Sequence, residues 1–136
     1  MSQVIWVNSL IDGKVKGDQH DNLYLLKYAS KLDQLCPDGK KFSDFVDYTD
    51  AQANMTGDFQ GFDDGWELLK HKAKWFEPDE GMSLLAKLIE RIQTEKARFG
   101  LLSDKSSEVL AELKHCSAAL DEIKKSGGKF HFCVVV

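Results

Sequence analysis

The chain has 136 residues, 43% of them hydrophobic and 29% charged, which is the composition of a soluble globular domain. Its formal net charge of −4 disfavours nucleic-acid binding, because proteins that bind phosphate backbones usually cluster Lys and Arg, and here these residues are spread out. No stretch approaches the ~20 apolar residues of a membrane span, and the start lacks the basic region of a signal peptide. The three cysteines, an odd number without an export signal, favour reduced thiols. We therefore expect one compact cytoplasmic domain, 1–136, that contacts neither nucleic acid nor membrane.

The first predicted element is a strand over residues 3–11, QVIWVNSLI, which has apolar side chains on both faces and is typical of an inner strand. Asp12-Gly13 follows, and this pair is a strong signal for a tight hairpin turn. The returning arm, Lys14-Val15-Lys16, is short and charged, as expected of an edge strand.

Helical spacing begins after Asp21 or Asn22, either of which is predicted to cap a helix that ends at Pro37-Asp38-Gly39. Ser43 is expected to start a brief helical turn. Residues 49–65 have little periodicity and are rich in Gly and Asp, so they are predicted to be mainly loop. Because the clear strands are few, we expect a further strand within residues 40–60.

Three more helices are predicted in the second half of the chain. The first follows Asp63 and Asp64, whose negative charges suit a helix N-terminus, and contains Trp66 and Leu69. The second begins at Pro78 and runs to about residue 99, and the last runs from about residue 103 to the glycine pair at 127–128.

The final residues, FHFCVVV, fit two interpretations. A cysteine followed by aliphatic residues resembles a prenylation signal, but valine is not a usual last residue for it and no polybasic stretch lies upstream. Alternating bulky side chains instead predict a strand that is apolar on both faces. We therefore expect an α+β fold in which the N- and C-terminal strands pair at the centre of a small sheet, packed against four to five helices.

An acidic cluster lies in the segment FSDFVDYTDAQANM. If this segment is helical, Asp44, Asp47, Asp50 and Asn54 lie along one face and could hold a hard cation such as Mg²⁺. The cluster would then support a metal-dependent enzyme, with His20 or Glu80 moving protons. The alternative is a solvated face of an amphipathic helix. No nucleophile or phosphate-loop motif accompanies the cluster, and no cofactor is expected.

A wider acidic and aromatic region extends from residue 44 to residue 80, and it contains ten acidic residues but only three lysines. Carboxylates mixed with large aromatics would attract and then anchor a protein partner with a basic surface. The alternative is that the aromatics belong to the core. The residues predicted to bind the partner are Asp44, Asp47, Asp50, Asp63, Asp64, Trp66 and Trp75.

The phrases IWVNSLIDG, DYTDAQANM, WFEPDEG and KFHFCVVV together resemble a group of small uncharacterised bacterial proteins. The resemblance spans most of the chain and names no chemistry. Small acidic bacterial proteins of this kind include toxin-neutralising immunity proteins, so by class analogy the leading expectation is a binding protein of that type. A homodimer formed through the apolar stripe of the last helix is a further alternative.

Overall fold

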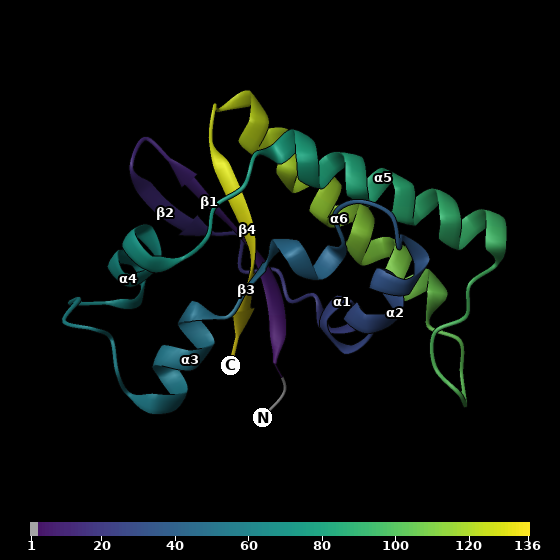
Figure 1. Ribbon diagram of the computed structural model, residues 1–136, viewed down its shortest axis with the longest axis horizontal. Helices are drawn as coiled ribbons and strands as arrows, with labels where there is room; N and C mark the ends of the chain where they lie inside the picture. The colour runs from purple at the N-terminus through teal and green to yellow at the C-terminus, as the bar shows by residue number, and fades with distance from the viewer. Residues whose placement is uncertain (1–2) are drawn as a thin grey trace.

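The two ends of the chain pair with each other at the centre of a four-stranded sheet (Figure 1). In this computed structural model, which describes residues 3–136, β1 (Val4–Ile11) runs antiparallel to β4 (Lys129–Val135), in register from Val4 opposite Val135 to Leu10 opposite Lys129. The strand order is β2-β1-β4-β3. The predicted α+β fold with paired terminal strands is therefore confirmed.

The two edge strands also follow the predictions. β2 (Lys14–Gly17) returns from β1 through Asp12 and Gly13, whose φ angles of 51° and 74° match the left-handed turn that an Asp-Gly pair favours. The strand expected between residues 40 and 60 is β3 (Val46–Asp47), which pairs with β4 in parallel after the 3₁₀ turn η1 (Phe42–Phe45).

One face of the sheet packs against the long hairpin of α5 (Pro78–Glu95) and α6 (Ser106–Lys125). The alternation of β4 places Phe130, Phe132 and Val134 on this face, and all three are fully buried. α5 approaches closely at Gly81, where an added Cβ would lie 2.8 Å from Cδ1 of Leu120 and would meet the Phe130 ring. The glycine therefore lets the helix pack against both neighbours.

Two short helices complete this side, α1 (Leu23–Lys27) and α2 (Ala29–Leu35). The sequence predicted one continuous helix here, and Tyr28 divides it. Helical hydrogen bonds still run from Tyr28 N to Tyr24 O and from Leu32 N to Tyr28 O, so α1 and α2 are two halves of the predicted helix. The Glu112 carboxylate of α6 accepts from the backbone N–H groups of Tyr24 and Leu25 and thereby ties α1 to α6.

The other face of the sheet carries α3 (Thr49–Thr56), which packs against β4, and α4 (Gly65–Lys72), which packs against β2. α3 lies where the sequence predicted mainly loop. It ends at Gly57 in the left-handed conformation, and the predicted loop follows it up to α4. Asp64 caps α4 by accepting from Glu67 N, as its position in the sequence indicated. Among the described residues, 3–136, no helix has the length and apolar character needed to cross a membrane.

Candidate functional site

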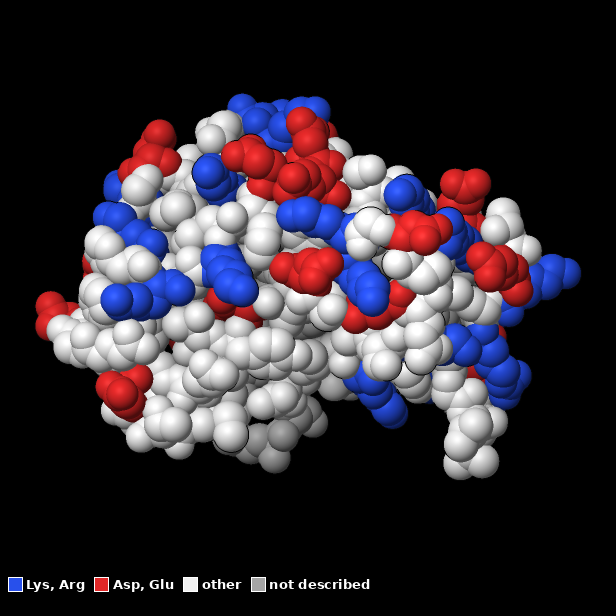
Figure 2. Space-filling model, in the orientation of Figure 1, with Lys and Arg blue, Asp and Glu red and all other residues white. Residues whose placement is uncertain are grey.

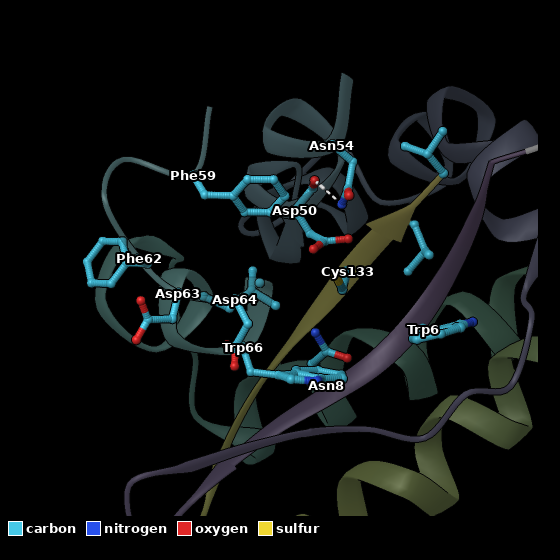
Figure 3. Close-up of a pocket in the computed structure, with 14 residues that line it drawn as sticks. Trp6, Asn8, Asp50, Asn54, Phe59, Phe62, Asp63, Asp64, Trp66 and Cys133 are labelled. Carbon is cyan, nitrogen blue, oxygen red and sulfur yellow. Dashed lines mark hydrogen bonds between the residues drawn. The ribbon is translucent and has the colours of Figure 1, made fainter. Parts of the chain in front are cut away.

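A pocket of about 540 Å³ lies between the second face of the sheet and the helices α3 and α4 (Figure 3). β1 and β4 provide its floor, and the segment from α3 to the first turn of α4 provides its wall. Its lining residues are Trp6, Asn8, Asp50, Asn54, Phe59, Phe62, Asp63, Asp64, Gly65, Trp66, Leu69, Cys133, Val135 and Val136.

The charged side chains of the pocket are all acidic. They are Asp50, Asp63 and Asp64, and no Lys or Arg lines the pocket. None of the ion pairs found within residues 3–136 involves these three carboxylates. Figure 3 shows the Asp50 carboxylate pointing into the pocket. Burial raises the pKa of Asp50, nearby Asp47 adds to this effect, and a hydrogen bond from Asn54 opposes it. A cation entering the pocket would relieve this unfavourable charge.

Four aromatic residues line the same pocket: Trp6, Phe59, Phe62 and Trp66. The Trp6 ring is held in place by its Nε1–H, which donates to Asp21 at 2.8 Å. The Trp66 side chain is 41% exposed, although it belongs to the pocket wall. Aromatic faces attract cations through their quadrupole, so the rings and the carboxylates favour the same class of ligand.

Asn8, on the pocket floor, forms a buried polar pair with His131, which lies opposite it on β4 and is not part of the pocket lining. His131 Nδ1 lies 3.0 Å from the carbonyl oxygen of Lys74, which can only accept, so Nδ1 carries the proton. Burial lowers the pKa of His131 to about 4, despite the nearby Asp47 carboxylate, and Nε2 of the neutral ring is then an acceptor. Asn8 Nδ2 therefore donates to Nε2 across 3.2 Å.

This hydrogen bond fixes the orientation of the Asn8 amide and leaves its oxygen, Oδ1, without a partner. Asn8 is only 1% exposed, so the unpaired oxygen lies at the base of an acidic pocket. A buried acceptor that lacks a donor costs about 1–3 kcal/mol. A ligand that brings an N–H group to this oxygen would recover part of that cost.

Cys133 is the one cysteine of the pocket lining, and its thiol is poorly suited to act as a nucleophile. Burial raises the pKa of its thiol to about 12, and the Asp50 and Asp47 carboxylates add to the rise. Nucleophilic cysteines react as thiolates, which require a lowered pKa. The Cys133 thiol is therefore held in its protonated, weakly nucleophilic form.

Four of the seven predicted partner-binding residues line the pocket: Asp50, Asp63, Asp64 and Trp66. The other three do not. Asp44 accepts from Lys41 N at the start of η1. Asp47 is buried and accepts from the backbone N–H groups of Thr49 and Lys74. Trp75 stacks on His131 at 4.1 Å and donates to the Leu69 carbonyl, so it packs beside the pocket on the same face of the sheet.

The helical premise of the predicted cation site is wrong. Residues 42–56 form a 3₁₀ turn, a short strand and a separate helix, because Val46 and Asp47 pair with β4 instead of continuing a helix. Asp44, Asp47 and Asp50 therefore lie on different elements. Within the described part of the chain, no group of three or more His, Cys, Asp or Glu side chains could hold a metal ion. Only Asp50 and Asn54 of the predicted ligands line the pocket.

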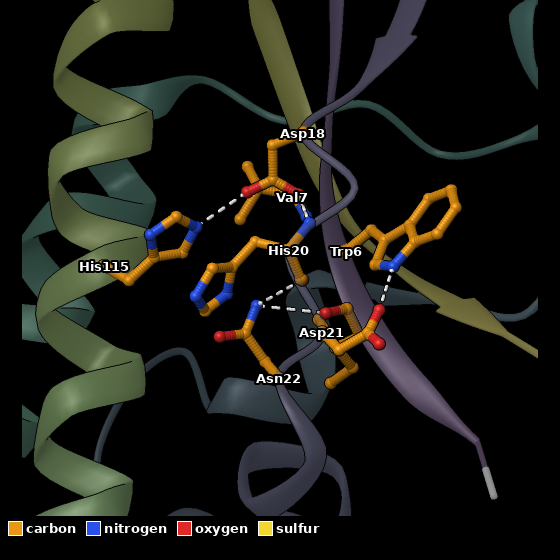
Figure 4. Close-up of polar contacts among 8 residues, drawn as sticks. Trp6, Val7, Asp18, His20, Asp21, Asn22 and His115 are labelled. Carbon is orange, nitrogen blue, oxygen red and sulfur yellow. Dashed lines mark hydrogen bonds and ion pairs between the residues drawn. The ribbon is translucent and has the colours of Figure 1, made fainter.

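The two predicted proton-transfer groups also lie outside the pocket lining. Glu80 forms an ion pair with Lys40 at 3.5 Å. His20 stacks on His115 at 3.6 Å, and His115 lies 2.8 Å from Asp18 (Figure 4). The other oxygen of the Asp18 carboxylate accepts from Val7 N and His20 N. These contacts attach the segment that follows β2 to β1 and α6.

Sequence reasoning missed the floor of the pocket. Asn8 and Cys133 lie on strands that the sequence identified, but the predicted site was confined to residues 44–80. One signal was present in the sequence: Asn8 interrupts an apolar strand that was expected to be internal. A buried amide at such a position requires a partner, and searching for that partner would have indicated His131 on the paired strand.

Charges of both signs are mixed over α5 and α6, whereas the surface near α3 and the chain ends shows few charges in the same view (Figure 2). This face therefore does not present the wide acidic surface that the sequence indicated. Of the ten acidic residues between 44 and 80, Asp50, Asp63 and Asp64 line the pocket. No protein-family model, curated protein or solved structure matches the chain.

Proposed function

We propose that this chain is a protein-binding domain that captures a partner with a basic surface at the pocket between the sheet and α3–α4. Toxin-neutralising immunity proteins act by capture of this kind, and we propose that class for the chain. No cofactor or catalytic group is required, because the function consists of occupying the partner's surface.

One observation carries the proposal: three carboxylates and four aromatic rings share one pocket in which no Lys or Arg is present. Aromatic side chains in desolvated pockets supply most of the binding energy of protein interfaces. Complementary charge increases the rate of encounter and selects the partner. Basic side chains of a partner would find both features in the same place.

The test is affinity capture from the native cell at low ionic strength, with the purified chain as bait. The bait variant is Asp50→Asn together with Asp63→Asn, which removes two pocket charges and leaves the Asp64 cap of α4 intact. We expect basic proteins that bind the wild-type chain to be lost from the variant, and to be released from the wild type as salt is raised.

A matched control removes the same amount of charge elsewhere. Asp12 and Asp38 are exposed, and neither lines the pocket. The double variant Asp12→Asn, Asp38→Asn should capture the same proteins as the wild type. Equal capture by the pocket variant and the control variant would show that the partner binds elsewhere, and the proposed contact would be wrong.

A further inference from the structure

The unpaired oxygen on the pocket floor, together with the acidic wall, specifies the group that binds there. Asn8 Oδ1 and the Asp50 carboxylate are both acceptors, one buried and one partly buried, and neither is paired with a cation of the described residues. We propose that the pocket receives a guanidinium group, the side chain of an arginine on the partner. This inference rests on the proposed function and deepens it.

A guanidinium fits this set of acceptors better than other biological cations do. It is planar and carries five N–H donors in a fixed arrangement, so it can pair with a carboxylate through two parallel hydrogen bonds and still donate to a third acceptor. Asp50 would take the paired hydrogen bonds, and Asn8 Oδ1 would take the additional one. The flat face remains free to stack on an indole ring.

Other cations satisfy fewer of these groups. The lysine ammonium is a compact, strongly hydrated charge that makes no planar paired contact with a carboxylate. A quaternary ammonium has no N–H group and would leave Asn8 Oδ1 without a donor. Both would gain from the aromatic rings, but only the guanidinium uses the rings, the carboxylate and the buried oxygen together.

The Trp6 and Trp66 indole rings both lie close to the buried oxygen. A Cβ added to Gly17 would lie 2.8 Å from Asn8 Oδ1, 3.1 Å from Cε3 of Trp6 and 3.3 Å from Cη2 of Trp66, so both indole rings and the oxygen adjoin the same small space. Figure 3 shows the Trp66 ring lying next to the Asn8 amide. In the bound state, the exposed indole moves away from the oxygen and stacks on the guanidinium plane. The environments of Trp66 and of the Asn8 amide therefore change together on binding.

The experiment is a titration of the full chain, labelled with ¹⁵N, with N-acetyl-arginine amide, N-acetyl-lysine amide and tetramethylammonium. The arginine probe should move the side-chain NH₂ signals of Asn8 and the indole signal of Trp66, and should bind about tenfold more tightly than the lysine probe. Tetramethylammonium, which has no N–H group for Asn8 Oδ1, should bind more weakly than the arginine probe. The Asn8 signals report on the amide directly, so Asn8 need not be replaced and its bond to His131 is kept.

The variant Asp50→Asn should bind the arginine probe about tenfold more weakly than the wild type does, whereas Asp12→Asn should bind it with unchanged affinity. Equal binding of the arginine and lysine probes, or Asn8 signals that do not move, would overturn the guanidinium assignment. If that happens while the pocket variant still loses its captured proteins, the proposed function remains and only the arginine assignment fails. If capture is also unaffected by the pocket variant, both are wrong.

Discussion

Acidification should destabilise the fold through His131, and replacing this residue should remove the effect. Burial lowers the pKa of His131 from its ordinary 6.5 to about 4, so between these two pH values the unfolded chain binds a proton that the folded chain does not. This protonation difference therefore leaves the free energy of unfolding unchanged above pH 6.5 and lowers it as the pH falls toward 4. At about 1.4 kcal/mol per pH unit, the loss amounts to about 3 kcal/mol.

Urea unfolding at pH 7, 5.5 and 4 would measure this loss for the wild type and for His131→Asn. Asparagine keeps an N–H group for the Lys74 carbonyl but has no titrating ring. The variant should be less stable than the wild type at pH 7. On acidification, its free energy of unfolding should fall by about 3 kcal/mol less than that of the wild type. Asp50 and Glu112, whose pKa values are raised, titrate in both proteins, so their contribution cancels in the comparison.

The control is His71→Asn, because His71 is exposed on α4. Its stability should fall with pH as steeply as that of the wild type. Equal slopes in the wild type and His131→Asn would refute the argument, since they would mean that the buried ring is not held neutral by the fold.

Two further predictions concern packing and are checked by thermal and urea unfolding. Gly81→Ala should destabilise the fold by about 1–3 kcal/mol, because the new methyl group meets Leu120. The control Ser83→Ala, on the exposed side of α5, should have little effect. A Gly81→Ala variant that is more stable than the wild type would contradict the close helix packing. Phe132→Ala should lower the free energy of unfolding by about 3–5 kcal/mol, because the Phe132 ring is fully buried. Trp66→Ala, at a 41% exposed position, should lower it by less than about 1 kcal/mol. Comparable losses in the two variants would contradict the assignment of Trp66 to the pocket wall.

The sequence could predict the strands and the long helices because their signals are local. The alternation in FHFCVVV identified β4, Asp12-Gly13 identified the hairpin turn, and Pro78 identified the start of α5. The pairing of the chain ends also followed, since two strands with apolar faces need each other's backbone groups.

The predictions failed where tertiary contacts decide the local structure. The spacing of Asp44, Asp47 and Asp50 fits a helix, but Val46 and Asp47 find backbone partners on β4 and end the helical turn. The short strand carries Asp47 inward, where the backbone N–H groups of Thr49 and Lys74 satisfy it. A solvated acidic face was therefore the wrong description of a buried carboxylate, and a one-dimensional pattern could not reveal donors from residue 74.

The same pairing shapes the pocket in which we propose that the partner binds. β3 adds to the edge of the sheet and positions α3, so that Asp50 faces the strand residues Asn8 and Cys133 across the pocket. His131 accepts a hydrogen bond from the Asn8 NH₂ group, and the orientation of the His131 ring is set by the Lys74 carbonyl. A valine at position 8 would avoid the cost of an unpaired oxygen but would leave His131 Nε2 without its donor. The polar pair thus holds an unpaired acceptor at the pocket floor, which lowers the stability of the fold. A ligand that donates a hydrogen bond to this acceptor would stabilise the folded chain.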